Sequence, residues 1–334
     1  MRNATYRLHW LHRLLGALVA LAAAASPAAA QEWPAKALTL VVAFPGGGDD
    51  DILARMLAPR ISQFLGQPVN VENVPGASGM IGAARVAKAP PDGYELLLGT
   101  SATHALSQTL LKKPPYNAVT DFTPVALLAE QPFVVIARKN LPGGNRVEDL
   151  VAYAKANPRT VQFASAGEGS STHLACMLFN AAAGIHASHI AYNGGVPAMR
   201  DVIAERVDYY CPAVTVAITP IARQDVKAIA VLARSRAQVL PDLASAHEQG
   251  LADFSAWTWF ALFLPRDVPE PVTAKLHDAA VGAIAMPFMQ ARLKQIGAEV
   301  VSPERRSQAY LQKFVESEIA KWTSDLKIAR LQPY

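Results

Sequence analysis

Apolar runs that alternate with glycine- or serine-rich loops and with helical patterns constrain the fold of this chain most. Residues 38–44 read LTLVVAF, an unbroken apolar run that is typical of a strand buried on both faces. A triple glycine follows, and apolar residues then recur at helical spacing from Ile52 to Ile61. The same order returns at residues 69–88 and 95–103. This alternation predicts α/β construction around mainly parallel sheets.

A second group of such units begins near residue 133, and the C-terminal part adds one more apolar run and three helices. Two groups of alternating units predict two α/β lobes. The expected elements are strands at 133–138, 206–211, 226–233 and 257–265, a strand, loop and helix within 161–182, and helices at 147–156, 196–205, 272–285, 287–296 and 303–326.

The first thirty residues resemble a secretory signal peptide. Arg2, Arg7 and Arg13 precede an apolar run at residues 14–25, and small residues lead up to Ala30. The run is short for a membrane span. We therefore expect cleavage after Ala30 and a mature protein in the periplasm; the alternative is a retained N-terminal anchor.

The charge of the chain argues against a nucleic-acid partner. The formal net charge is +4, but the signal holds three of the basic residues and no acidic one. The mature chain is therefore nearly neutral. Its length of about 300 residues is enough for two lobes with their own cores.

The loops that connect strands to helices are the expected ligand site, because ligands of open α/β sheets bind outside the carboxyl ends of the strands. Four such loops are rich in glycine, serine and threonine, and they supply the N–H groups and helix N-termini that hold a small anion. They lie at residues 44–51, 99–104, 165–173 and 192–197.

Motifs for catalysis or for cofactor binding do not occur in the sequence. The triple glycine lacks the spacing of a dinucleotide fingerprint, and G-x-x-x-x-G-K-[ST], G-x-S-x-G and H-E-x-x-H are absent. We therefore expect no cofactor, no metal and no enzymatic activity. The alternative is a serine hydrolase in which Ser171 or Ser101 works with His173 or His104.

Three aspartates follow the triple glycine, where an anion would bind. Asp51 is interpreted most simply as a helix cap or first-turn residue, worth about 0.5–2 kcal/mol. Asp50 would repel a carboxylate by about 1–4 kcal/mol at close range. Asp50 therefore either points to solvent or meets a ligand group that carries protons, and the same question is open for Asp49. A calcium site is a further alternative, although calcium loops space their ligands by two residues.

Cys176 and Cys211 are the two cysteines of the chain. In an oxidising compartment they could form a bridge, which would add about 4 kcal/mol by closing a loop of this length. The alternative is two buried free thiols. Their spacing does not indicate zinc.

Four segments of the mature chain form a recognisable set. They are WPAKALTLVVAFPGGG from Trp33, VENVPGASGMIGAARVAKAPPDGYELLLGT from Val71, FASAGEGSSTHLA from Phe163 and HIAYNGGVPAMRDVIAERVDYY from His189. Together they resemble the Bug-type receptors, the extracytoplasmic substrate-binding proteins of tripartite tricarboxylate transporters. The resemblance covers essentially the whole mature chain. It implies a type II periplasmic-binding-protein fold, in which two lobes joined by a two-segment hinge close on a small organic carboxylate.

The resemblance also implies the domain boundaries and the partners. The first lobe would comprise residues 31–133 and 230–334 and the second 134–229, with the hinge near 131–137 and 229–233. The ligand would be a di- or tricarboxylate, an aromatic carboxylate or an amino acid. A monomeric receptor would deliver it to the small and large membrane subunits of a transporter. A receptor that presents its ligand to a signalling kinase would have the same fold.

The family motif assigns ligand-binding residues to both lobes, and this chain departs from it in two places. Family members commonly have small residues and a threonine where Asp49 and Asp50 stand, and many have an aspartate where this chain has Pro212. A subset carries cysteines in these same segments, which favours a Cys176–Cys211 bridge. The candidate ligand-binding residues are Phe44, Gly46, Gly47, Gly48, Asp50, Asp51, Thr100, Ser101, Ser165, Ala166, Gly167, Ser171, Thr172, His173, Tyr192, Gly195 and Pro212.

Overall fold

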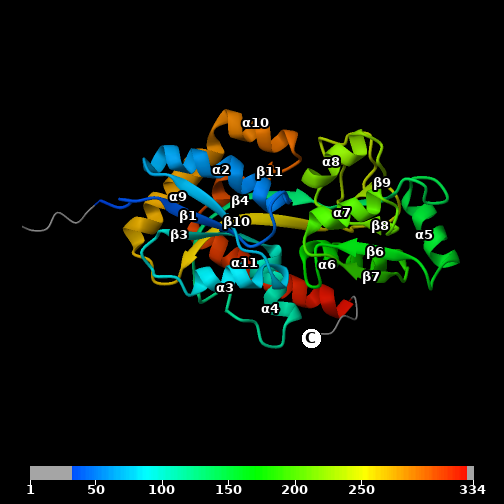
Figure 1. Cartoon of the computed structure of the whole chain (residues 1–334), viewed down its shortest axis with the longest axis horizontal. Coiled ribbons are helices and arrows are strands. Elements are labelled where there is room, and N and C mark those ends of the chain that lie inside the picture. The colour runs from blue at the N-terminus through cyan, green and yellow to red at the C-terminus, as the bar shows by residue number, and fades with distance from the viewer. Residues whose placement is uncertain (1–31, 329–334) are drawn as a thin grey trace, which may run out of the picture. The chain divides into compact units, whose positions relative to one another are not determined.

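The computed structural model describes residues 32–328, in which contacts join the chain from Lys36 onward into one unit. The expected signal peptide and its cleavage after Ala30 lie outside the described residues. Two sheets and the helices that pack on them build this unit (Figure 1). Among residues 32–328, no helix combines the length and the hydrophobicity that a membrane span requires.

The first sheet has six strands in the order β11-β4-β10-β3-β1-β2. Strand β1 is parallel to both neighbours, and its buried Leu40 lies opposite Val71 on one side and Leu96 on the other. This interior position explains the unbroken apolar run. The strands are β1 Leu38–Val42, β2 Val69–Asn73, β3 Glu95–Thr100, β4 Phe122–Pro132, β10 Trp257–Pro265 and β11 Glu299–Val300.

The second sheet has five strands in the order β7-β6-β8-β5-β9. Strand β6 is parallel to both neighbours, with Phe163 opposite His189 in β7 and Tyr209 in β8. Separate hydrophobic clusters cover this sheet, one around Phe163 and Phe179 and one around Ile136 and Tyr210. The strands are β5 Val134–Arg138, β6 Gln162–Ser165, β7 Ser188–Ala191, β8 Tyr209–Tyr210 and β9 Val226–Val231.

Both sheets are mixed rather than mainly parallel, which corrects the prediction from the sequence. Strand β10 is antiparallel to β3 and β4, and β5 is antiparallel to β8 and β9. The reason is topological. The chain runs from β4 through Phe133 into β5 of the other sheet and returns in β10, so the strands that link the sheets oppose their neighbours.

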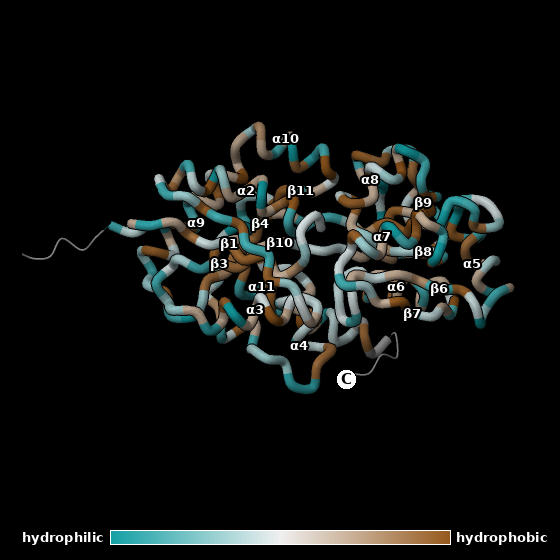
Figure 2. Tube along the Cα trace, in the orientation of Figure 1, coloured by the Kyte–Doolittle hydropathy of each residue, from teal (hydrophilic) through white to brown (hydrophobic). Residues whose placement is uncertain are grey.

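Helices cover the sheets, and α2 and α9 pack side by side on the first sheet (Figure 1). In Figure 2 the hydrophobic residues concentrate along the inner strands. Helices α2 and α6 end at Gly66 and Gly184, both in the left-handed conformation that glycine adopts at little cost. The helices are α2 Asp49–Leu65, α3 Met80–Ala87, α4 Ser107–Leu110, α5 Val147–Ala156, α6 Ser171–Ala183, α7 Gly195–Ile203, α8 Val214–Ala222, α9 Glu270–Ala285, α10 Pro287–Gln295 and α11 Gln308–Ile328, with short turns of other helix types at Ala77–Gly79, Ala102–Leu106 and Pro303–Arg305.

Two segments connect the sheets, and they meet where the N–H of Phe133 donates to the carbonyl of Ala256, at 3.1 Å. Residues 232–256, which the sequence assigns to the first lobe, pack against the second sheet through Leu232, Ala246 and Ala256. We therefore propose that the second crossing lies at residues 256–257 rather than near 229–233. The first crossing, at Phe133, falls within the expected hinge at 131–137.

A disulfide joins Cys176 of α6 to Cys211, directly after β8, with the two Cα atoms 5.4 Å apart. Both residues are fully buried in the cluster around Phe163. The bridge holds α6 beside the strand that ends at Tyr210.

Candidate functional site

A small cavity lies between the two sheets, at the place where four helices begin. The N-termini of α2, α6, α7 and α8 all contribute to its lining. Each N-terminus carries free N–H groups and about half a positive charge, so the four together favour an anion. The lining residues are Phe44, Pro45, Gly48, Asp49, Asp50, Ala166, Ser170, Ser171, Thr172, Gly194, Gly195, Val196, Tyr210, Ala213 and Val216.

The two walls of this cavity almost touch, and its volume is about 40 Å³. A Cβ atom built on Gly194 would lie 2.9 Å from Cγ of Pro45, and one built on Gly47 would lie 3.4 Å from Cγ2 of Val196. Both glycines have positive φ angles, 106° and 86°. The structure is therefore a closed arrangement, and a ligand of several carbon atoms enters only if the walls move apart.

Asp51 organises the glycine loop instead of lining the cavity. Its carboxylate accepts hydrogen bonds from the N–H of Gly47, Nδ2 of Asn73 and Nε of Arg55, each at 3.0 Å. Burial opposes ionisation, but the bonds from Arg55, Gly47 and Asn73 outweigh it and hold the pKa of Asp51 below its usual value. This outcome agrees with the interpretation of Asp51 as a first-turn residue and removes it from the cavity wall.

Asp49 and Asp50 both line the cavity. Asp50 is only 8% exposed. Burial, together with the neighbouring charge of Asp49, raises the pKa of Asp50 well above its usual value. Burial likewise raises the pKa of Asp49 to about 6, against hydrogen bonds from the backbone N–H groups of Asp49 and Asp50 and from Nε2 of Gln131. The position of Asp50 excludes the alternative that it points freely to solvent.

Gln131 connects this acidic pair to the crossing between the sheets. Its side chain is fully buried near the end of β4, and its Nε2 donates to Oδ2 of Asp49 at 2.8 Å. Its Oε1 accepts from the hydroxyl of Thr215 in α8. The same hydroxyl also lies 2.8 Å from the carbonyl oxygen of Ile296, at the end of α10. Because a hydroxyl has one proton, it can donate to only one of these acceptors at a time.

The second wall presents hydroxyl and backbone groups at the starts of α6 and α7. Ser170 caps α6 by accepting from the N–H of His173 at 3.2 Å. The hydroxyl of Thr172 accepts from the N–H of Ala166 at 2.9 Å. Burial raises the pKa of Tyr210, whose hydroxyl would lie 3.0 Å from a Cβ on Gly195. This wall is therefore polar and uncharged.

Part of the set predicted from the sequence surrounds the cavity. These residues are Phe44, Gly48, Asp50, Ala166, Ser171, Thr172 and Gly195. The structure places the others outside the lining, where they shape the loops. These are Gly46, Gly47, Asp51, Thr100, Ser101, Ser165, Gly167, His173, Tyr192 and Pro212.

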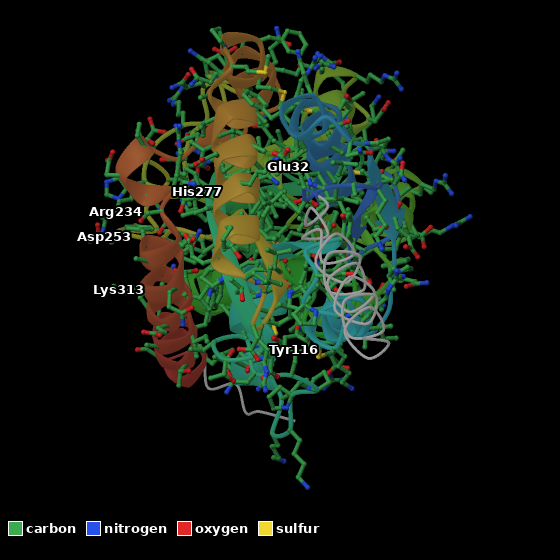
Figure 3. The ribbon with its side chains drawn as sticks, turned by 90° about the vertical axis from the view of Figure 1, so that its left-hand side faces the viewer. Glu32, Tyr116, Arg234, Asp253, His277 and Lys313 are labelled. Atoms are coloured by element: carbon green, nitrogen blue, oxygen red, sulfur yellow. A yellow bond between two sulfur atoms is a disulfide. The ribbon has the colours of Figure 1, made fainter. Side chains whose placement is uncertain are left out.

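Buried hydrogen bonds hold the loop residues of this second group in place, although the hydroxyl of Thr100 is buried without a partner. Ser101 Oγ lies 3.0 Å from Thr258 Oγ1, and the N–H of Thr100 donates to Thr103 Oγ1 at 2.9 Å. The carbonyl of Thr103 in turn accepts from the hydroxyl of Tyr116, which is labelled in Figure 3, at 2.6 Å. The loop after β3 is thus fastened internally.

Hydrogen bonds and ring stacking also hold the histidines and the tyrosine that lie beside the second sheet. Nδ1 of His173 accepts from the N–H of Gly169 at 3.1 Å, and its ring stacks on His189 with the centroids 3.9 Å apart. Burial and, to a smaller extent, the neighbouring His189 lower the pKa of His173 to about 3. Ser165 Oγ lies 2.6 Å from Nε2 of His189. The hydroxyl of Tyr192 donates to Asp201 at 2.8 Å.

The serine–histidine pairs of the hydrolase alternative are therefore not assembled. Ser101 is bound to Thr258, His173 to Gly169, and Nδ1 of His104 lies 3.0 Å from Thr103 Oγ1. Within the described part of the chain, no group of three or more His, Cys, Asp or Glu side chains is placed to hold a metal ion.

Several lining residues were not predicted from the sequence. Tyr210, Ala213 and Val216 surround the start of α8, a helix that the sequence pattern does not predict. The sequence marks Asp49 as a departure from the family pattern but does not determine the direction of its side chain. Ser170 and Gly194 lie inside the predicted loops, so their backbone position was foreseen and their contact with the cavity was not.

A larger cavity of about 380 Å³ lies at the end of α10 and includes Lys294 and Arg306. The guanidinium of Arg306 is bound to the carbonyl of Val301 at 2.9 and 2.8 Å. The C-terminal end of α10 faces this cavity through Gly297, and helix C-termini disfavour anions. The smaller cavity is therefore the better candidate for a carboxylate.

Two mixed α/β sheets joined by two crossings, with helix N-termini meeting at a cavity between them, define the class of two-lobed periplasmic binding proteins. Residues 53–330 match TctC, the tripartite tricarboxylate transporter family receptor. The chain belongs to this family.

Individual relatives agree with the family assignment. Protein BugT of Bordetella pertussis is 31% identical over 310 residues, which cover 92% of this chain and 94% of BugT. MatC from Rhodopseudomonas palustris, solved with bound malate, is 35% identical with a TM-score of 0.84, and the match covers 88% of this chain and 100% of the MatC chain. Rpa4515 of R. palustris, solved with adipate, is 32% identical with a TM-score of 0.86, and the match covers 91% of this chain and 100% of the Rpa4515 chain.

Proposed function

We propose that this chain is the solute-binding receptor of a tripartite tricarboxylate-type transporter. It captures a small organic carboxylate in the periplasm, after removal of residues 1–30, and passes it to the small and large membrane subunits. The convergence of helix N-termini on one cavity carries the proposal, because the uncharged starts of α6, α7 and α8 stabilise a carboxylate without a basic side chain. The malate bound by MatC and the adipate bound by Rpa4515 support the ligand class.

Closure is the proposed mechanism. A ligand that contacts both walls stabilises the closed arrangement relative to the open one, and it can shift this balance only by its preference for the closed form. Phe133 and residues 256–257 are the places where the chain crosses between the sheets, so we assign the hinge to them. The closed form is then the one that docks on the membrane subunits.

Binding measurements on the mature protein test this proposal. The protein is freed of carried-over ligand by unfolding and refolding, and then titrated with di- and tricarboxylates, aromatic carboxylates and amino acids. A compound at 100 times its Kd stabilises the fold by about 2.7 kcal/mol. The proposal fails if no carboxylate of any kind stabilises the protein.

A matched pair of variants tests the location. Gly195→Val fills the cavity, because a Cβ at this position already lies 3.0 Å from the hydroxyl of Tyr210. It should abolish carboxylate binding, whereas Ala182→Val, on the exposed side of α6, should not. Cross-linking in cells to the membrane subunits, rather than to a kinase, would distinguish transport from sensing.

A further inference from the structure

The two walls of the small cavity differ in charge. The wall from the first sheet carries Asp49 and Asp50, the first residues of α2. The wall from the second sheet carries hydroxyl, backbone and apolar groups at the starts of α6, α7 and α8, with Tyr210 between them. Among residues 32–328, no lysine, arginine or histidine lines this cavity. Beyond the partial charges of the helix N-termini, a cation opposite the two aspartates must therefore come from the ligand.

Among residues 32–328, no cationic side chain pairs with Asp50. The side chain is buried, and the hydrogen bond that its carboxylate accepts comes from the backbone N–H of Asp50 itself. The nearest charges, on Asp49 and Asp51, have the same sign. Arg55, the neighbouring cation, is bound to Asp51 and Asn73 instead. One backbone hydrogen bond does not balance the charge of a buried carboxylate, so this wall suits an arriving group that is positively charged and carries protons.

Plain di- and tricarboxylates match only one wall. One carboxylate can bind at the starts of α6 and α7, but a second then approaches Asp49 and Asp50 across a narrow cavity. Two negative charges about 4 Å apart repel strongly enough to weaken binding by about a thousandfold at an effective dielectric constant near 20. An ammonium group in the same place is attracted instead.

Resting on the proposed receptor function, we propose that the cavity binds a small zwitterion, with its carboxylate at the N-termini of α6 and α7 and its protonated amine at Asp49 and Asp50. An α-amino acid is the simplest such molecule. Asp50 sets the preference for the amine, because Asp49 already accepts a bond from Gln131. Burial raises the pKa of both carboxyl groups, so closure without a cation favours their protonation. A ligand ammonium group supplies positive charge in place of that proton.

Calorimetric titration with matched pairs of compounds tests this assignment. Each pair differs only in the amine: aspartate and succinate, glutamate and glutarate, alanine and propionate, and the other common amino acids with their deaminated forms. Measurements at about pH 8 keep the ligand amines protonated. Tyr210, the other titratable group near the pair, stays neutral there because burial raises its pKa. We expect the amino member of at least one pair to bind about tenfold more tightly or better.

Two variants connect the preference to Asp50. Asp50→Asn keeps the shape of the side chain and should bring the affinity ratio of that pair close to one. Asp278→Asn removes a carboxylate whose side chain is 84% exposed on α9 and should leave the ratio unchanged. An unchanged ratio in Asp50→Asn overturns the assignment to this residue.

The outcomes separate this inference from the proposed function. If plain carboxylates bind as tightly as their amino partners, the zwitterion is wrong and the carboxylate receptor stands. If plain carboxylates bind tightly only at acidic pH, the extra proton belongs to the aspartate pair itself, which also overturns the inference. If no compound of either kind binds, the inference and the proposed function are both contradicted.

Discussion

Replacing Asp49 with asparagine should stabilise the ligand-free protein at alkaline pH, because the fold opposes ionisation of this carboxyl group. Burial raises its pKa from 3.8 to about 6. A carboxyl group whose pKa is higher in the folded chain binds its proton more tightly there, so stability falls as the pH rises from about 4 to about 6. The shift of about two units corresponds to about 3 kcal/mol, which the partial exposure of Asp49 reduces to about 1–3 kcal/mol.

Urea unfolding of the wild type and of Asp49→Asn at about pH 4 and about pH 8 measures this difference. The variant retains an oxygen that can accept from Gln131, so the two proteins should be similar at the lower pH and the variant more stable at the higher one. Asp51→Asn is the control of opposite sign. The pKa of Asp51 is lowered in the fold, so its ionised form stabilises the protein above about pH 4, and its loss should destabilise at pH 8. A gain for Asp49→Asn that does not depend on pH, or a loss at pH 8, would refute the reasoning.

Three further predictions concern closure, the disulfide and a buried histidine. Gly194→Ala places a methyl group 2.9 Å from Pro45 at a positive φ angle and should weaken carboxylate binding about tenfold or more in a calorimetric titration; unchanged affinity would show that this contact does not form on closure. Thiol alkylation without reductant should label neither Cys176 nor Cys211, and replacing both with alanine should lower the unfolding free energy by about 4 kcal/mol, so a labelled native protein would contradict the bridge. His173 should stay neutral down to about pH 4 in an NMR titration, since burial lowers its pKa to about 3; titration near 6.5 would mean that it is exposed.

The regular elements of this fold could be predicted from the sequence where one pattern dominates. The run at β10 and the helix α5 were predicted with the bounds that the structure has, Trp257–Pro265 and Val147–Ala156. Strand β4, Phe122–Pro132, was missed because it contains proline and crosses from the first sheet toward the second, so its burial follows no simple alternation. Helix α8 contains Pro220, which interrupts its helical sequence pattern, so the sequence does not predict this helix. The predicted site therefore lacks one of the four helix N-termini that line the cavity.

The candidate site was predictable at the level of loops and not of side chains. Glycine and serine patterns identified the starts of α2, α6 and α7, all of which reach the cavity. The direction of each side chain depends on tertiary contacts that no local pattern contains. Asp49, Asp50 and Asp51 are adjacent in sequence, yet only Asp51 turns back to Arg55 and Asn73. Ser165 and His173 are residue types that often bind ligands, but here they form hydrogen bonds with His189 and Gly169 of their own lobe.

A crystal structure of the mature protein with a bound carboxylate ligand tests the central claim most directly. The account predicts the ligand carboxylate in the small cavity, with its oxygens about 3 Å from backbone N–H groups at the starts of α6 and α7, near Thr172 and Gly195. The same ligand in the larger cavity beside Lys294, or with its carboxylate against Asp50, would contradict it.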